Sequence, residues 1–408
     1  MIRVLYLLLP ALLFGDTLKS ILEHAHQNNN LLQSYKYTKD AKEKEVESKK
    51  SDFFPKIDIG ASYKNTSDVT PFQISDIYSG YGRVEVDVYD GGIKSSQLER
   101  AKNEHKASAH DESQERKNIS LEIVRDFYEI QSLKALLAAK EDAKKSMHEQ
   151  LERVKQFYDA KLATRDDVER LQASYDTNIY EIESVLFEIL SAKKALEIKV
   201  GKKIESFESS AFMEISADTF EQSDSIKSLL YKQNALQSSS KALEGAYYPK
   251  VKLEDVYTVY GYNDIESTHP AKIDKQNIAL LSLNMRIFDY GATSEAKQAV
   301  DLNAKALSKQ MEYMSHKQKA DYEISIARLE SVKLKIQSAK SALTSAQSAF
   351  KTINEKYNAG IVDYVIYLDA LSAKTSASAL YERSLCELEI AHALFYYHSG
   401  KNLEEFLK

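Results

Sequence analysis

Apolar residues between Leu329 and Tyr357 recur at alternating spacings of three and four residues. They are Leu329, Val332, Ile336, Ala339, Leu343, Ala346, Phe350, Ile353 and Tyr357. A repeat averaging about 3.5 residues keeps one seam of a helix facing a partner helix, and it makes the two helices supercoil left-handedly. The pattern therefore predicts a long helical arm that packs as part of a coiled coil.

The same arm occurs a second time, 199 positions earlier. The equivalent positions are Ile130, Leu133, Leu137, Lys140, Lys144, Met147, Leu151, Val154 and Tyr158, of which seven are apolar or aromatic. A heptad pattern by itself indicates only a generic coiled coil. Its duplication predicts an internal two-fold repeat, and the sequence that flanks each arm indicates what is repeated.

Two short stretches before each arm alternate with a period of two. Each predicts a β-strand with one apolar and one polar face. Pro55 and Pro249 end the preceding helices, because proline lacks an amide hydrogen and restricts the residue before it. In the first half, the alternating apolar residues are Ile57, Ile59, Ala61 and Tyr63, then Val84, Val86 and Val88. In the second half, one strand begins at Val251 and the other contains Leu281, Leu283, Met285 and Ile287.

Each strand pair ends in an aromatic-Asp-x-Gly motif, where glycine permits the backbone to turn into a long helix. The first helix is expected from Ile93 to about Tyr158, and at ~1.5 Å per residue it is on the order of 100 Å long. A turn and a return helix follow, to Gly201 in the first half and Gly400 in the second. The motifs are Tyr89-Asp90-Gly91-Gly92 and Phe288-Asp289-Tyr290-Gly291, and the turns are Ala160-Lys161-Leu162 and Ala359-Gly360-Ile361.

Composition agrees with long helices and narrows the function. The 408 residues include no Trp, 12 Gly and 5 Pro, and the net charge of −6 arises without a basic block. Nucleic acid is therefore not an expected partner. The 26 Tyr are many for a helical rod. They indicate surfaces where one end of the ring is apolar and the other is in contact with water.

The first 15 residues are typical of a secretory signal peptide, with Arg3 before an apolar run that ends at Gly15. No later stretch reaches the roughly 20 apolar residues of a transmembrane helix. The single cysteine, Cys386, allows no internal disulfide and is expected to be a small buried apolar residue. We expect a signal peptide at 1–15, a first structural repeat at 16–201, a polar linker at 202–224, a second repeat at 225–400 and a C-terminal tail at 401–408.

Four strands with one apolar face cannot close a barrel alone. An open sheet edge in lipid leaves backbone groups unpaired, at a cost of several kcal/mol each. Alternating strands of about ten residues suit an outer-membrane barrel. Closure therefore requires other copies of the chain, and three copies would supply twelve strands with the helical arms continuing beneath them as a tube.

The order of the motifs resembles the TolC-type outer-membrane efflux proteins over nearly the whole mature chain. Two copies of a helix, an aromatic-Pro-Lys strand, a loop, a strand, an aromatic-Asp-x-Gly motif and a long helical hairpin carry the resemblance. It implies a homotrimer with a 12-strand β-barrel in the outer membrane and an α-helical barrel in the periplasm. The implied function is a passive exit duct of a tripartite efflux pump or a type I secretion system. The implied partners are a periplasmic adaptor (membrane fusion) protein, an inner-membrane transporter and outer-membrane lipid.

In such a duct, the polar strand faces line a water-filled lumen and the apolar stripes face lipid. No motif indicates an enzyme, a cofactor or a metal site. The chain has no GxxxxGK[ST] phosphate loop, and its nine His are scattered, so transport energy would come from the inner-membrane partner. The expected lining residues are Lys56, Asp58, Arg83, Glu85, Asp87, Asn284 and Arg286.

The resemblance also implies a gate at the far ends of the arms, where hydrogen bonds and ion pairs tie the helix tips together near an acidic ring. By position, Asp167 and Tyr357 match the tie residues, Asp369 matches one ring residue, and Asp166 lies beside them. Two alternatives stay open. The carboxylates are also favoured near helix starts by the helix dipole, and Tyr357 is also the last apolar position of its heptad seam.

The chain departs from the family pattern at two gate positions. Val362 stands where some members carry a tie arginine, and Ile366 stands where they carry a second ring aspartate. The tie is then weaker here, or it is rerouted through Arg165.

The two turns lie where the family's tips meet the periplasmic adaptor. Gly360 matches the usual glycine, whereas Lys161 does not. The alternative interpretation is a turn that simply requires glycine.

An exported coiled-coil spacer or adhesin without channel activity is the alternative function. Its strands would form soluble hairpins, and the protein would be recovered without detergent. A charge at Val86 or Leu283 separates the two functions, since a charge facing mid-bilayer lipid costs roughly 2 to 4 kcal/mol and an exposed hairpin would tolerate it.

Overall fold

The computed structural model describes residues 17–67, 70, 72–208, 210–214, 220–263 and 270–408. The expected signal peptide, residues 1–15, lies outside the described residues. The chain forms two compact units, and the two longest helices each contribute residues to both units. The first contains the described residues up to Ser34, together with Ser113–Asp224 and Ser315–Lys408, and the second contains Tyr35–Glu112 and Ser225–Met314.

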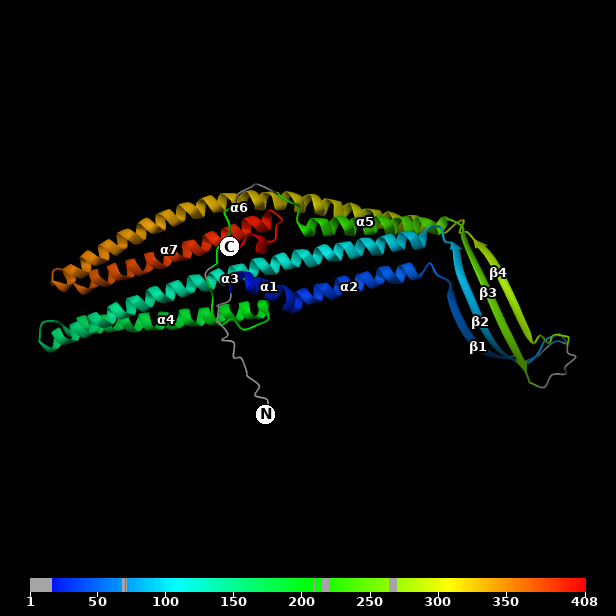
Figure 1. Ribbon diagram of the computed structural model, residues 1–408, viewed down its shortest axis with the longest axis horizontal. Coiled ribbons are helices and arrows are strands. Elements are labelled where there is room, and N and C mark those ends of the chain that lie inside the picture. The colour runs from blue at the N-terminus through cyan, green and yellow to red at the C-terminus, as the bar shows by residue number, and fades with distance from the viewer. Residues whose placement is uncertain (1–16, 68–69, 71, 209, 215–219, 264–269) are drawn as a thin grey trace, which may run out of the picture. The chain divides into compact units, whose positions relative to one another are not determined.

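The same order of long helices and strands occurs twice along the chain (Figure 1). The first half contains α1 (Leu18–Asn28), α2 (Asn30–Ser51), β1 (Lys56–Asn65), β2 (Asp76–Tyr89), α3 (Ile93–Asp159) and α4 (Arg165–Val200). The second half contains α5 (Asp224–Glu244), the 3₁₀ helix η1 (Gly245–Tyr247), β3 (Lys250–Tyr262), β4 (Lys275–Asn284), α6 (Ala292–Asn358) and α7 (Tyr364–His398), and the 3₁₀ helix η2 (Leu403–Phe406) follows.

The two helical arms have the same length. α3 and α6 each contain 67 residues, and their first residues, Ile93 and Ala292, are 199 positions apart. The return helices α4 and α7 begin at Arg165 and Tyr364, which are also 199 positions apart. The offset predicted from the heptads therefore extends to the boundaries of the helices.

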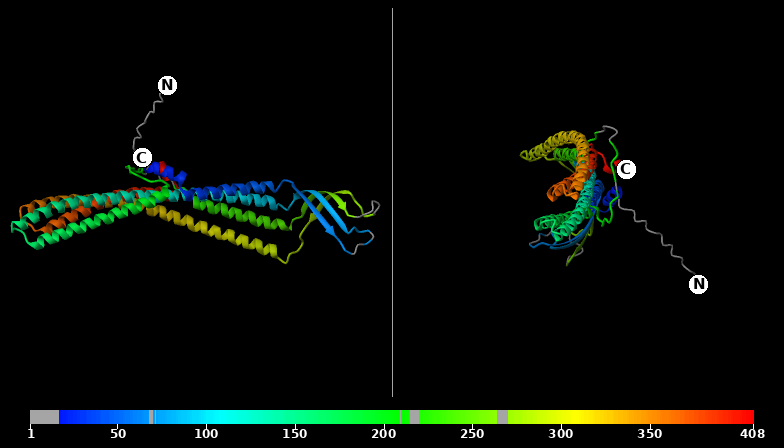
Figure 2. Two further views of the ribbon diagram at one scale, coloured as in Figure 1. Left: turned by 90° about the horizontal axis from the view of Figure 1, so that it is seen from below. Right: turned by 90° about the vertical axis from the view of Figure 1, so that its left-hand side faces the viewer.

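The predicted heptad seam of α6 is the covered face of that helix. Leu329, Val332 and Ala339 are buried, and the other six predicted positions are half-buried. Leu334, which lies outside the seam, is 68% exposed. Within the first unit, α4 lies along α3 and α7 lies along α6 in each view (Figures 1 and 2).

The first unit has one large apolar core, to which α1 contributes a complete face. Leu18, Ile21 and Leu22 are fully buried in a cluster with Phe127 of α3 and Leu196 of α4. The spacing of these α1 residues places them on one side of the helix. This short helix therefore anchors the beginning of the described chain to the first helical hairpin.

The helical segment that precedes Pro55 is interrupted at Asn29. The side-chain amide of Asn29 donates to the carbonyl oxygen of Lys199 at 2.7 Å, and its Oδ1 accepts from the Leu32 amide at 3.0 Å. An asparagine that accepts from an amide three residues later caps a new helix, so the chain forms α1 and α2 separately.

Described residues of the expected linker (202–224) and of the expected C-terminal tail (401–408) pack against each other. Phe212 and Leu407 form an antiparallel bridge, and both are buried in the core of the first unit. Ile204 and Leu403 are fully buried in the same core. These apolar residues fix both segments at the base of the helical hairpins.

Cys386 lies half-buried against this core, in partial agreement with the expectation. Burial raises the pKa of its thiol to about 11, so the thiol stays protonated and unreactive near neutral pH. None of the helices in the described chain combines the length and the apolar character that a bilayer-spanning helix needs.

In the second unit, the four strands form one antiparallel sheet in the order β1-β2-β3-β4 (Figure 1). Lys56 lies opposite Glu85 in the first hairpin, and Lys250 lies opposite Asn284 in the second. β2 and β3 join the hairpins, from Ile77 opposite Tyr262 to Tyr89 opposite Val251. Within the described chain, β1 and β4 each pair on one side only, so the sheet has two open edges.

The prediction for the fourth strand was wrong in its boundaries. Alternation of Leu281, Leu283, Met285 and Ile287 predicted a strand over these residues, whereas β4 runs from Lys275 to Asn284. It ends there because its partner β3 begins at Lys250, opposite Asn284. Residues 285–288 therefore have no neighbouring strand within the chain.

Candidate functional site

The polar face of the sheet carries a network of ion pairs between β2 and β3. The Nε of Arg83 lies 3.3 Å from Oε1 of Glu254, and the Nζ of Lys252 lies 2.7 Å from Oε2 of Glu85 and 3.5 Å from Oε2 of Glu254. These side chains come from alternate positions and share one face of the pleated strands. The network makes this face polar and charged.

The network contains residues that sequence reasoning missed. Lys252 and Glu254 were not assigned to the lumen, although they alternate with Val251 and Leu253, which is the signal that identified the other strands. Asp87 pairs with Lys94 at 2.7 Å instead, at the start of α3.

The other expected lining residues lie toward the two open edges. Lys56 and Asp58 lie on β1, opposite Glu85 and Arg83. Asn284 is the last residue of β4, and Arg286 follows the strand. Within the described residues, neither Asp58 nor Arg286 forms an ion pair.

The opposite face of the sheet is apolar and uncovered in the single chain. The exposed fractions are 89% for Ile59, 62% for Val88, 43% for Leu253 and 68% for Leu283. An apolar face of this extent requires a partner, because soluble surfaces rarely expose contiguous apolar patches. Three charged residues lie on this face: Asp255, which is opposite Val84 and Ala279, and, at the loop end, Asp76 and Lys275.

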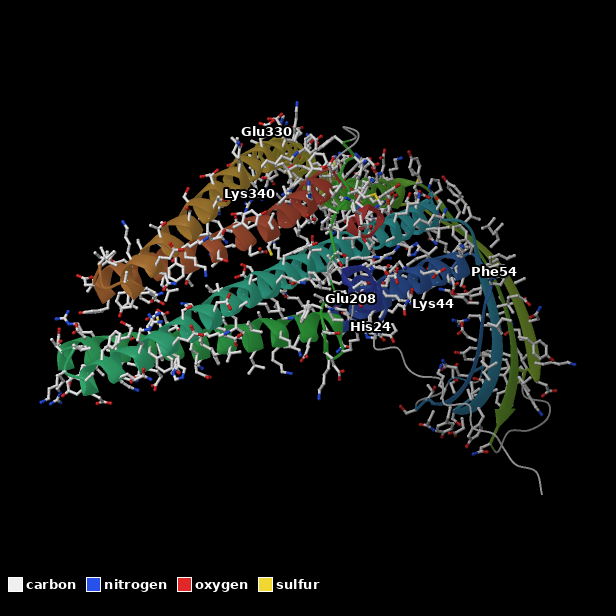
Figure 3. The ribbon with its side chains drawn as sticks, turned by 60° about the vertical axis from the view of Figure 1, so that its left-hand side comes forward. His24, Lys44, Phe54, Glu208, Glu330 and Lys340 are labelled. Atoms are coloured by element: carbon white, nitrogen blue, oxygen red, sulfur yellow. The ribbon has the colours of Figure 1, made fainter. Side chains whose placement is uncertain are left out.

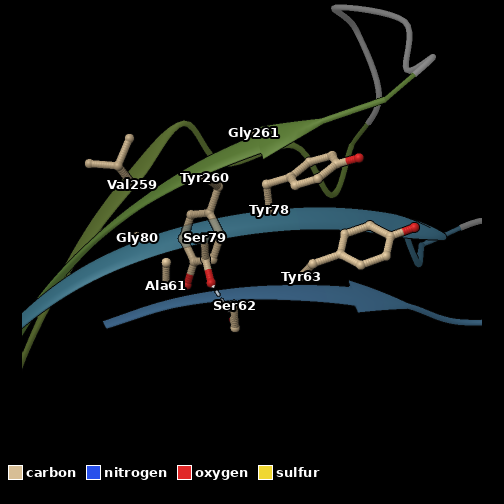
Figure 4. Close-up of a pocket in the computed structure, with 9 residues that line it drawn as sticks. All are labelled: Ala61, Ser62, Tyr63, Tyr78, Ser79, Gly80, Val259, Tyr260 and Gly261. Atoms are coloured by element: carbon tan, nitrogen blue, oxygen red, sulfur yellow. Dashed lines mark hydrogen bonds between the residues drawn. The ribbon is translucent and has the colours of Figure 1, made fainter. Parts of the chain in front are cut away.

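Tyrosines gather at the loop end of the sheet. The rings of Tyr63 and Tyr78 stack with centroids 4.8 Å apart, and Tyr260 and Tyr262 stack at 6.5 Å. Figure 4 shows Tyr63 and Tyr78 side by side near the ends of β1 and β2. The Tyr63 hydroxyl donates to Asp76 at 2.5 Å.

A second aromatic row lies at the helix end of the sheet. Phe54 is 69% exposed and stands between α2 and β1 (Figure 3), and Tyr248, Phe288 and Tyr290 are also exposed. Two aromatic rows that bound an apolar band are typical of the two interfaces of a β-barrel with its membrane.

Asp90 and Asp289 perform the same structural task at the two strand-to-helix junctions. The Asp90 carboxylate accepts from the amides of Gly92 and Lys94 at 2.9 and 2.6 Å. The Asp289 carboxylate accepts from the amides of Gly291 and Thr293, both at 3.1 Å. Each aspartate thus satisfies free amides at the start of a long helix, where its negative charge also favours the helix dipole.

Gly91 is required by a close approach as well as by its backbone conformation. Its φ is +75°, and a Cβ at this position would lie 2.4 Å from the carbonyl oxygen of Gly245. Gly92 and Gly291 have φ of +79° and +83°. Pro55 and Pro249 directly precede β1 and β3 and mark the other side of the same junctions.

The two turns at the arm tips have the same backbone. Lys161 has φ of 62° and Gly360 has φ of 71°. In both turns the amide of the following residue, Leu162 or Ile361, donates to a carbonyl five residues earlier. Leu162 and Ile361 are 77% and 70% exposed, and Ala160 and Ala359 begin the turns.

The expected gate aspartates differ in their surroundings. Asp167 forms a capping box with Thr164, whose amide and hydroxyl donate to it at 2.9 and 2.7 Å. Asp166 forms an exposed ion pair with Arg170 at 2.9 Å. Asp369 is exposed on the second turn of α7. The structure therefore gives Asp167 a capping role beside any role in gating.

Tyr357 packs on a residue that sequence reasoning missed. Its ring stacks on Tyr367 of α7 with centroids 4.9 Å apart. Tyr367 is buried, and its hydroxyl donates to the carbonyl oxygen of Ser146 in α3 at 3.5 Å. Burial raises the pKa of Tyr357, and it raises the pKa of Tyr367 to about 12, so both rings are neutral.

A second contact joins the two hairpins near the tips. Arg153 of α3 donates a hydrogen bond to the side chain of Asn358 at the end of α6. Arg165, through which the tie could be rerouted, pairs by its Nε with Glu169 in its own helix at 2.6 Å.

Comparison with known proteins identifies the class to which this arrangement belongs. Residues 21–198 match the family model described as outer membrane efflux protein. Over these residues the chain is similar to the outer membrane efflux protein family. The matching proteins are described as outer membrane proteins or channels.

Similar proteins match nearly the whole chain. The outer membrane protein TolC of Vibrio cholerae serotype O1 is 22% identical in an alignment of 408 positions, which covers 95% of this chain and 92% of TolC. The Campylobacter jejuni CmeC outer membrane channel matches with a TM-score of 0.84 at 15% identity, over 95% of this chain and 86% of CmeC. A membrane protein of Pseudomonas aeruginosa matches with a TM-score of 0.82 at 16% identity, over 95% and 91%. At these identities, the structural matches establish the fold.

Proposed function

We propose that this chain is an outer membrane efflux protein, three copies of which form one passive exit duct across the outer membrane. The open-edged sheet carries the proposal. One of its faces holds an ion-pair network and the other is apolar, as expected for a wall between a water-filled lumen and lipid. Four strands cannot close such a wall, and unpaired strand edges are not tolerated within lipid, whereas twelve strands from three copies can.

Exposed apolar residues on the helices support association of copies. On α4, Tyr180 is 73% exposed, Phe187 is 70% exposed and Ile198 is 80% exposed. Large apolar side chains that gather on one exposed helix mark a surface for protein contact. In the proposed duct this surface packs against a neighbouring copy, and the helices form the periplasmic tube.

We place the gate at the tips of the two hairpins. The Tyr357–Tyr367 stack and the Arg153–Asn358 hydrogen bond hold the hairpins together there. Three copies of Asp369 would form an acidic ring that favours cations.

The exposed tip residues Leu162 and Ile361 suit contact with a periplasmic adaptor protein. The adaptor would connect the duct to an inner-membrane transporter, which supplies the energy for a tripartite efflux pump or a type I secretion system. Within each copy, residues 16–201 and 225–400 serve as two structural repeats that 202–224 connects.

Reconstitution in planar lipid bilayers tests the proposal. Detergent-purified protein should run as a trimer and should form discrete channels whose reversal potential in a salt gradient shows cation preference. A protein that stays monomeric in detergent and forms no conductance would overturn the proposal. Recovery of the native protein from the periplasm without detergent would favour the exported spacer instead.

A further inference from the structure

The two hairpins of the sheet have the same internal register. Lys56 lies opposite Glu85, and Lys250, 194 positions after Lys56, lies opposite Asn284, which is 199 positions after Glu85. β1 therefore corresponds to β3, and β2 corresponds to β4. This correspondence turns the observed β2–β3 pairing into a template for any strand that pairs with the open edge of β4.

We infer that β4 and the residues after it pair with β1 of a second copy in the register of the β2–β3 seam. This inference rests on the trimeric duct proposed above. The observed pairs of Val86 with Leu253 and of Asp87 with Lys252 translate into Met285 opposite Ile59 of the second copy and Arg286 opposite its Asp58. The observed pair of Tyr89 with Val251 translates into Phe288 opposite Ile57.

Residues 285–288 give the first argument. Their counterparts Val86, Asp87 and Tyr89 belong to β2 and pair with β3. Residues 285–288 continue the same alternation after β4 has ended for lack of a partner strand. The exposed fractions are 89% for Ile287 and 70% for Phe288, which a strand of a second copy would reduce.

Charge gives the second argument. In the inferred seam, the acidic and the basic residue have exchanged places relative to the observed seam. Asp87 and Lys252 lie opposite each other in β2 and β3, and their counterparts are Arg286 and Asp58. Opposite charges at directly opposed positions stabilise a strand pair, whereas like charges destabilise it. The reversal therefore preserves the complementarity of the seam.

The remaining charges of the observed network are absent from the inferred seam. In β2 and β3, Asp87 and Lys252 are drawn to other partners, Lys94 and Glu85. The counterparts of these two partners are the uncharged Thr293 and Asn284. The counterparts of Arg83 and Glu254 are Ser282 and Gly60. Arg286 and Asp58 are therefore the only charged pair that the seam contains at these positions.

The junction beside the strands gives a third argument. Gly91 lies against Tyr248. A Cβ added to Gly91 would lie 2.9 Å from the Cβ of Tyr248. The counterparts of Gly91 and Tyr248 are Tyr290 and Phe54, which are 92% and 69% exposed in the single chain. In the inferred seam, these two aromatic residues from different copies come together.

Cysteine cross-linking tests the register. Since Cys386 is the only cysteine, a Cys386→Ser background is free of thiols. In two antiparallel strands, directly opposed residues alternate between closely and widely spaced Cα atoms, and all the opposed residues on one face have the same spacing. We therefore introduce one cysteine pair on each face. Ser282→Cys with Ser62→Cys and, separately, Leu283→Cys with Ala61→Cys are each in the inferred register.

Two matched control variants carry cysteine pairs on the same faces but two residues out of the inferred register, which is about 7 Å along a strand. They are Asn284→Cys with Ser62→Cys and Leu281→Cys with Ala61→Cys. After mild oxidation, we expect covalent dimers and trimers from at least one pair in register and a several-fold lower yield from its shifted control.

The outcomes separate this inference from the proposed function. Faster cross-linking of the shifted pairs, or no cross-linking in a sample that light scattering shows to be trimeric, overturns the register while the trimer stands. A sample that is monomeric before oxidation overturns both.

Charge reversal provides a second readout. Arg286→Glu should lower the temperature at which the trimer dissociates in mild detergent, since it faces Asp58 of the neighbouring copy. Asp58→Lys, which also faces Arg83 within its own hairpin, should raise that temperature when it is added to Arg286→Glu. A further decrease in the double variant would contradict the pairing.

Discussion

Tyr357 at the end of α6 stacks on Tyr367 of α7, with ring centroids 4.9 Å apart and planes inclined by 25°. The pair lies in a small apolar cluster with Phe350 and Ala143, where the Tyr367 hydroxyl reaches the backbone of α3. The tips of the two hairpins are thus held by aromatic packing in addition to polar contacts.

Removing this stack should loosen the closed tip. An aromatic pair contributes about 1 kcal/mol beyond its burial, so we expect Tyr357→Ala and Tyr367→Ala to raise single-channel conductance or open probability several-fold. Tyr37→Ala, at an exposed position of α2, is the matched control. Unchanged current in both tip variants would remove the pair from the gate.

Asp167 requires a variant that separates capping from gating. Asp167→Ala should raise the conductance, as expected for a tie residue, but it also removes the cap, at a cost of about 1 kcal/mol. Asp167→Asn keeps an oxygen that can accept from Thr164 and removes only the charge. Equal currents in Asp167→Asn and the native protein, with a raised current in Asp167→Ala, would assign the effect to the cap.

Asp369 should set ion preference. Three exposed carboxylates at one level of the pore favour cations, so Asp369→Asn should move the reversal potential in a KCl gradient toward zero. Glu382→Gln, at another exposed position of α7, should leave it unchanged. If both variants shift the potential equally, the selectivity arises from the overall charge of the duct and not from a ring.

Lys161 and Gly360 should respond in opposite directions to substitution. Both have positive φ, which costs a residue other than glycine roughly 1–2 kcal/mol. Lys161→Gly should therefore slow hydrogen exchange at the first tip, whereas Gly360→Ala should accelerate it at the second. Faster exchange in Lys161→Gly would show that the lysine side chain stabilises its turn.

Adjacent positions of β4 should differ sharply in their tolerance of charge. Leu283→Lys places a charge toward lipid at a cost of roughly 2–4 kcal/mol, and we expect much less heat-stable trimer in membranes. Asn284→Glu, on the polar face opposite Lys250, should assemble as the native protein does. Equal yields from the two variants would indicate that the sheet lies outside the bilayer.

Regular periodicity was sufficient to predict most of the fold. The heptads located α3 and α6, and the alternation after Pro55 located β1, because both patterns arise from burial along a single element. The same reasoning placed the fourth strand too late. Met285 and Ile287 have the pattern of a strand, but a strand also requires a neighbour, and the single chain supplies none there.

Contacts between distant segments could not be read from the sequence. The bridge of Phe212 with Leu407 joins segments 195 positions apart, and neither segment has a period that reveals it. Tyr367 was missed for a similar reason, since its role depends on Ser146 and Tyr357 from two other helices. Lys252 and Glu254 could have been found, because they continue the alternation of β3.

Electron cryo-microscopy of the native protein in lipid nanodiscs is the most direct test of the central claim, that three chains pool their strands to close one pore. The account predicts one closed barrel of twelve strands within the lipid disc, four from each of three chains, with the helices forming a single tube outside it. A self-contained monomer, or a sheet that lies outside the lipid, would contradict it.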